Sequence, residues 1–144
     1  MYERILHPTD GSEGSAAAAD HAIDLAKQYD ATLHSVYAVN ANVGPEAGVV
    51  GVFEALEEAG HEAIDAFEAR AAAAGIESVE GAVVDGRPLQ AILDYVDDHD
   101  VDLVVMGTHG RTGLDRYLLG SVAEKVVRRC PVPVLTVRSP VEAD

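Results

Sequence analysis

The chain has 144 residues, a length that fits one domain with a hydrophobic core of its own. Asp and Glu outnumber Lys and Arg by 25 to 10, which argues against a sequence-independent grip on nucleic-acid phosphates. No apolar run approaches the roughly 18 residues of a membrane span and the N-terminus lacks a signal-peptide pattern, so we expect a cytoplasmic protein without membrane contact.

The acidic surplus gives a formal net charge of −15, and only Lys27 and Lys125 are lysines. This composition is typical of proteins from a cytoplasm with molar salt, so a halophile-like surface is one hypothesis. Ordinary solubility through net charge is the other. Circular dichroism at increasing KCl concentration separates the two, because full folding without salt contradicts the first.

The first 50 residues predict two strands around one helix. Arg4 to Thr9 is the first strand, and Ser12 or Ser15 can cap the helix that follows the turn letters DGSEGS. An apolar face at i, i+3 and i+4 spacing runs through that helix. Thr32 to Val39 is the second strand, and residues 40–50, rich in Gly, Asn and Pro, predict a loop.

A long helix is predicted from about Val52 to Gly75, with Gly75 as its C-terminal cap. Its inward residues follow the helical period: Phe53, Leu56, Ala63, Ile64, Phe67 and Ala71. His61 on this helix and His21 on the preceding one lie among acidic residues, and we interpret both as solvated histidines instead of metal ligands.

Ser78 to Val84 predicts the third strand, and the turn Asp85 to Pro88 opens a further helix. The apolar stripe of this helix consists of Leu89, Ile92, Leu93 and Val96. Carboxylates are unfavourable at a helix C-terminus, so we place the acidic residues that follow in the exit loop. They are Asp97, Asp98 and Asp100.

The run from Val101 to Met106 is continuously apolar, which predicts a central strand covered on both faces. A short helix follows the next, glycine-containing segment, with Val122, Val126 and Val127 inward, and Pro131 stops it. Cys130 is the only cysteine and is interpreted as a packing residue. Val132 to Arg138 predicts the last strand, and residues 139–144 are expected to fray.

Five strands alternating with four helices predict an α/β fold, a doubly wound, Rossmann-like parallel sheet with right-handed crossovers in one domain, 1–144. The residues alone permit two strand orders. In the order 3-2-1-4-5 the first and fourth strands are neighbours, which brings Asp10 beside Gly107. In the order 2-1-3-4-5 Asp10 faces Asp85 instead.

The segment from Gly107 to Ser121 joins the fourth strand to the last helix and carries the spacing Gly107, two residues, Gly110, nine residues, Gly120, Ser121. Glycines at a strand end and a helix start expose main-chain N–H groups, which together form an anion site. The spacing is neither a Walker A motif nor a dinucleotide-binding fingerprint.

In this spacing, and from Ile5 to Val137 generally, the chain resembles the universal stress protein family, in the branch that binds ATP. The resemblance implies the order 3-2-1-4-5 and an ATP site, with any Mg²⁺ or Mn²⁺ held chiefly by the phosphates. It also implies a homodimer formed by antiparallel pairing of two copies of the last strand, Val132 to Arg138. The implied contact residues are Asp10, Val39, Gly107, Gly110, Gly120, Ser121 and Val122. The strand order adds Pro8, Thr9 and Met106, and His109 is a further candidate through its positive charge.

Within that resemblance, Asp10 is assigned to the ribose and adenine, the main chain around Val39 to the adenine, and the glycines with Ser121 to the phosphates. Two residues depart from the family pattern. Ala123 replaces a frequent Thr or Ser, which removes one hydrogen bond to a phosphate or a metal-bound water. His7 replaces an aliphatic residue and is interpreted as a buried strand histidine with satisfied hydrogen bonds, the alternative being a pH-sensitive contact.

The sequence leaves three functions to compare. The first is an ATP-binding regulatory module with at most slow ATP hydrolysis, because the sequence contains no catalytic constellation. The second is a dimeric interaction protein without nucleotide, in keeping with Ala123. The third is a phospho-accepting receiver domain, suggested by Asp10, Asp85 and Thr108, although no acidic pair follows the first strand.

Overall fold

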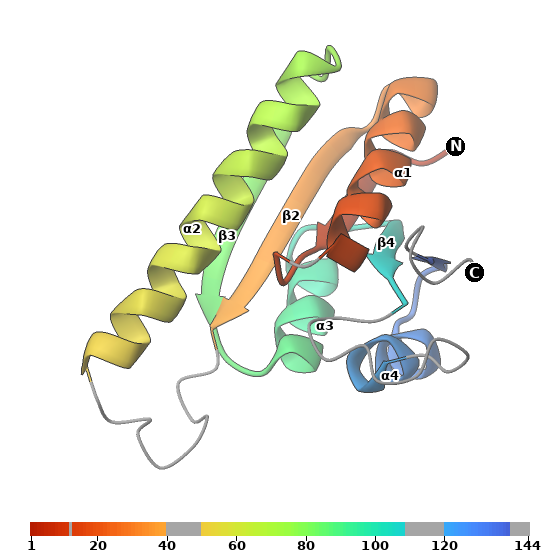
Figure 1. The fold of residues 1–144 in the computed structure, drawn as a ribbon. Coiled ribbons are helices and arrows are strands. Elements are labelled where there is room, and N and C mark those ends of the chain that lie inside the picture. Colours follow the sequence, from red (N-terminus) through yellow and green to blue (C-terminus); the bar gives the residue numbers. More distant parts are fainter. Residues whose placement is uncertain (12, 40–49, 109–119, 139–144) are drawn as a thin grey trace.

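The computed structural model describes residues 1–11, 13–39, 50–108 and 120–138 (Figure 1). The described part alternates strands and helices in the expected order. The elements are β1 (Arg4–Pro8), α1 (Glu13–Tyr29), β2 (Thr32–Val39), α2 (Val50–Ala73), β3 (Val79–Asp85), α3 (Pro88–Asp98), β4 (Leu103–Gly107), α4 (Ser121–Arg129) and β5 (Val134–Val137). None of the described helices is long and apolar enough to cross a lipid bilayer.

All five strands are parallel and lie in the order β3-β2-β1-β4-β5. Ile5 of β1 aligns with Leu33 of β2 on one side and with Leu103 of β4 on the other. This confirms the first of the two strand orders. Asp85 ends the edge strand β3, in register with Val39, so it does not adjoin Asp10 as a receiver-like site requires.

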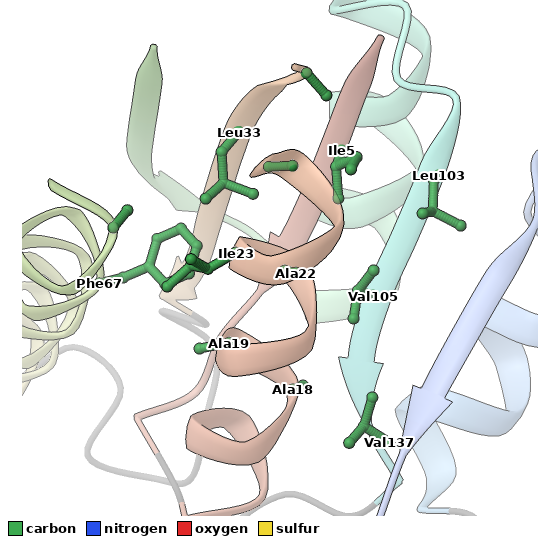
Figure 2. Close-up of a cluster of buried hydrophobic side chains, with 13 residues drawn as sticks. Ile5, Ala18, Ala19, Ala22, Ile23, Leu33, Phe67, Leu103, Val105 and Val137 are labelled. Atoms are coloured by element: carbon green, nitrogen blue, oxygen red, sulfur yellow. The ribbon is translucent and has the colours of Figure 1, made fainter. Parts of the chain in front are cut away.

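Helices cover both faces of the sheet: α1 and α2 lie side by side on one face, and α3 and α4 lie on the other (Figure 1). Figure 2 shows the core under the first pair, where small residues of α1 let the helix approach β1 and β4 closely and Phe67 of α2 closes the side. The buried aliphatic residues of β1 and β4 alternate between these two cores, as strands covered on both faces require.

The C-terminus of α2 follows the predicted glycine cap. Gly75 has a φ of 95°, which a glycine adopts without steric cost. The N–H groups of Gly75 and Ile76 donate to the carbonyl oxygens of Ala72 and Ala71, both at 3.0 Å, and this pair of bonds is the Schellman motif. Ile76 packs with Ala71 against the same core, so the cap also fixes where the chain turns toward β3.

Two local predictions were wrong, and one of the two serines predicted as possible caps of α1 is ruled out. Ser15 is a residue within α1 and does not cap it, and Ser12 lies outside the described residues. Asp97 and Asp98 belong to the last turn of α3, where the N–H of His99 donates to the carbonyl of Tyr95 and closes the helix. Val127 is 45% exposed, because α4 is rotated so that Ala123 and Val126 face the core.

Candidate functional site

A crevice of about 250 Å³ opens where β1 and β4 end. Its walls come from the end of β1 and the residues after it, the start of α1, the end of β4, the first two turns of α3 and the first turn of α4. The lining residues are Pro8, Thr9, Asp10, Ser15, Pro88, Ile92, Met106, Gly107, Thr108, Gly120, Ser121, Val122 and Ala123. Ligands of open α/β sheets bind at this kind of position, beyond the strand ends where the winding reverses.

The strands separate at the crevice because Pro8 ends the hydrogen-bond ladder between β1 and β4. The N–H of Thr9 faces β2, where it donates to Val36, so position 8 faces β4. Proline has no N–H to donate to the carbonyl of Val105. The imidazole of His7 supplies that donor, with Nδ1 lying 3.0 Å from the Val105 carbonyl oxygen.

His7 is 1% exposed, and its ring packs on Phe67 with the ring centroids 4.9 Å apart. Burial lowers the pKa of His7 to about 4, although the hydrogen bond to Val105 raises it in part. The ring is therefore neutral near pH 7, and its Nδ1 carries the proton because a carbonyl oxygen only accepts. The interpretation of His7 as a hydrogen-bonded strand histidine is confirmed.

Side-chain oxygens hold the turn between β1 and α1. The N–H of Gly11, whose φ is 79°, donates to Oγ1 of Thr9 at 3.0 Å. Oγ of Ser15 donates to Oδ1 of Asp10 at 3.0 Å, and the N–H of Asp10 lies 3.3 Å from the same Oγ. The Asp10 carboxylate is thus fixed at the wall of the crevice.

The first turn of α4 forms the opposite wall. Gly120 is the N-cap residue and has no side chain of its own with which to cap the helix. The N–H of Gly120 donates to the carbonyl of Thr108 at 2.7 Å, which ties the helix start to the end of β4. The next N–H groups, of Ser121, Val122 and Ala123, have no acceptor within the helix. N–H groups of this kind, together with the positive end of the helix dipole, can bind an anion.

Eight of the eleven predicted contact residues line the crevice. They are Pro8, Thr9, Asp10, Met106, Gly107, Gly120, Ser121 and Val122. Val39 is buried at the end of β2 and does not line it, and the Val39 carbonyl accepts from the N–H of Gly86 at 2.9 Å. His109 and Gly110 lie outside the described residues.

The sequence did not indicate that α3 lines the crevice through Pro88 and Ile92. These residues are four apart, so the helical period places them on one face of α3. The period does not show which part of the protein that face contacts. Ser15, which the sequence predicts as a possible helix cap, is a lining residue instead. In the part of the chain that the structure describes, no group of three His, Cys, Asp or Glu side chains is arranged to hold a metal ion.

Comparison with known proteins finds relatives over nearly the whole chain. Residues 1–138 match the model of the universal stress protein family. A universal stress protein of Methanocaldococcus jannaschii is 39% identical over 146 aligned positions, which cover 97% of this chain and 84% of that protein. The structure of universal stress protein UspA from Lactobacillus plantarum has a TM-score of 0.83 at 29% identity, with 95% and 98% of the two chains covered. A universal stress protein in complex with cAMP has a TM-score of 0.75 at 29% identity, with 96% and 98% covered.

Proposed function

This chain belongs to the universal stress protein family, and on that basis we propose that it binds ATP or another adenine nucleotide in the crevice and acts as a nucleotide-dependent regulatory module. The proposal rests mainly on the different chemistry of two facing walls of the crevice. The start of α4, with a glycine at its N-cap, offers N–H groups to an anion, and Asp10 offers a carboxylate to hydroxyl or amino groups. A nucleotide presents these two chemistries at its two ends.

The phosphates are assigned to the first turn of α4 and to the main chain of Gly107 and Gly120. The ribose is assigned to Asp10, and Ile92 with Pro88 supplies apolar surface. The contact of adenine with the main chain near Val39 remains part of the proposal, because a carbonyl oxygen that accepts from Gly86 has a second lone pair.

The net charge of −15 opposes the approach of a nucleotide. Screening limits this effect, because the Debye length is about 8 Å at physiological ionic strength and about 3 Å at 1 M salt. Distant carboxylates then contribute little, whereas N–H groups in direct contact with a phosphate are hardly screened. The local site therefore decides the binding.

Equilibrium dialysis of the purified protein with ATP, ADP, AMP and cAMP tests the proposal. We expect saturable binding of at least one of them. Absence of saturable binding of all four favours the alternative of an interaction protein without nucleotide. Mass spectrometry of nucleotide released from the protein as purified identifies which of the four it carries.

We also propose that two copies associate through β5, the edge strand beside β4. Leu135 of β5 is 39% exposed, and Val127 of α4 is 45% exposed. Exposed apolar side chains beside an unpaired strand edge favour antiparallel pairing with a second copy. The symmetry would be twofold, since each strand then meets the same strand of its partner.

A further inference from the structure

Ser15 makes two hydrogen bonds to a single residue of the crevice. Its Oγ donates to the Oδ1 of Asp10 at 3.0 Å and lies 3.3 Å from the Asp10 main-chain nitrogen, which donates to it. Together the two bonds close a ring that runs from the Asp10 nitrogen through its side chain to Oδ1 and back through the Ser15 Oγ. The side-chain torsion of Asp10 is therefore restricted before any ligand arrives.

The position of Ser15 explains why this arrangement is rigid. Ser15 is the third residue of α1 and is 9% exposed, so the helix backbone fixes its Cα. It lines the crevice on one side and a second hollow on the other. That hollow lies between α1 and α2, and its lining includes Ala16, Ala19, Ala63 and Ala66 as well as the polar residues His7, Thr9 and Arg70.

We propose that Ser15 is a positioning residue for nucleotide recognition, which holds the Asp10 carboxylate in the orientation that the ligand requires. The inference rests on the proposed function and extends it to a residue that need not touch the nucleotide. Without the Ser15 hydroxyl, the Asp10 side chain gains rotational freedom that binding must then remove, so affinity falls by about two- to tenfold.

A double-mutant cycle on nucleotide affinity tests this role, because it separates an effect through Asp10 from a general structural effect. The four proteins are the wild type, Ser15→Ala, Asp10→Ala and the double variant, each titrated with ATP by calorimetry. Ser15→Ala replaces a helix residue with the strongest helix former, so the fold is expected to persist. Ser15→Thr retains the hydroxyl and is the matched control.

We expect Ser15→Ala to weaken ATP binding by about fivefold in the wild-type background and by less than about 1.5-fold in the Asp10→Ala background. Ser15→Thr should bind ATP within about twofold of the wild type. An unchanged thermal unfolding temperature of this variant shows that the hollow accommodates its added methyl group. An equal loss in both backgrounds, or no loss in the wild-type background, overturns the inference. If the wild type binds neither ATP nor ADP, AMP or cAMP, the proposed function fails, and this inference fails with it.

Discussion

The imidazole of His7 donates to the carbonyl oxygen of Val105 across the point where β1 and β4 separate. A side chain therefore replaces the backbone donor that Pro8 lacks, and the two strands stay joined at the base of the crevice. This contact links the stability of the sheet to the geometry of the site.

We expect His7→Phe to destabilise the protein by about 1 to 3 kcal/mol, because it keeps a ring against Phe67 but leaves the buried Val105 carbonyl without its donor. Urea unfolding followed by circular dichroism measures the change. His21→Phe is the control, since His21 is exposed, and it should change the unfolding free energy by less than about 0.5 kcal/mol. Equal effects of the two substitutions would contradict the role given to His7.

The lowered pKa of His7 predicts how stability depends on pH. The unfolded chain binds a proton at His7 near pH 6.5, whereas the folded chain does so only near pH 4. The unfolded state therefore binds more protons between these values, and the unfolding free energy falls as the pH drops from 6.5 to 4. The shift corresponds to a loss of about 3 kcal/mol.

His7→Phe lacks this group, so its unfolding free energy should fall less steeply over the same window. The comparison removes the contributions of other groups, including His34, whose pKa is lowered by burial with the same sign. Parallel pH profiles for the wild type and the variant would show that His7 does not titrate as its burial predicts.

The sequence predicted the elements well where local chemistry determines them. The predicted bounds of the second strand, Thr32–Val39, agree with the structure at both ends. Gly75, which has a positive φ, follows the end of α2, and Pro88 is the first residue of α3, as the backbone preferences of glycine and proline predict. Helix rotation was less predictable, because the valines of α4 fit two faces equally well. Only contacts with β5 and α3 bury Val126 with Ala123 and leave Val127 exposed.

The residues of the candidate site also differ in how well the sequence predicted them. Gly120 and Ser121 were predicted from their spacing, which reflects main-chain geometry. The neighbouring position of Asp10 and Gly107 depended on strand order, which the residues alone left open and the resemblance to a family decided. Ile92 and Ser15 entered the site through tertiary packing that no local pattern encodes.

Thr136 offers a test of the proposed dimer. The carbonyls of Pro133 and Val137 accept from β4, so the N–H of Thr136 faces the open edge. Thr136→Pro removes that N–H without breaking the ladder to β4, and we expect it to shift a dimer to a monomer. Thr136→Val keeps the N–H and should remain dimeric. Light scattering at micromolar concentrations measures both, and a wild type that is monomeric there contradicts the proposal.

The crevice also predicts a slow ATPase at most. Asp10 carries the one carboxylate among its described lining residues, and its Oδ1 already accepts from the Ser15 hydroxyl. We expect turnover with Mg²⁺ or Mn²⁺ to stay below about 1 s⁻¹, the low end of ordinary enzymes. Phosphate release measures it. A faster rate that is lost in Asp10→Ala would make the protein an enzyme instead of a binding module.

The proposed site requires that the N-terminus of α4 binds the phosphates, and a comparison of the ATP affinities of Gly120→Asp and Gly120→Asn measures this. Both residues are favoured at an N-cap and have nearly the same shape, so both variants should fold. Only Asp places a negative charge where the phosphates would lie. We expect Gly120→Asp to bind ATP at least about tenfold more weakly than Gly120→Asn by calorimetry. Equal dissociation constants for the two variants would contradict the account.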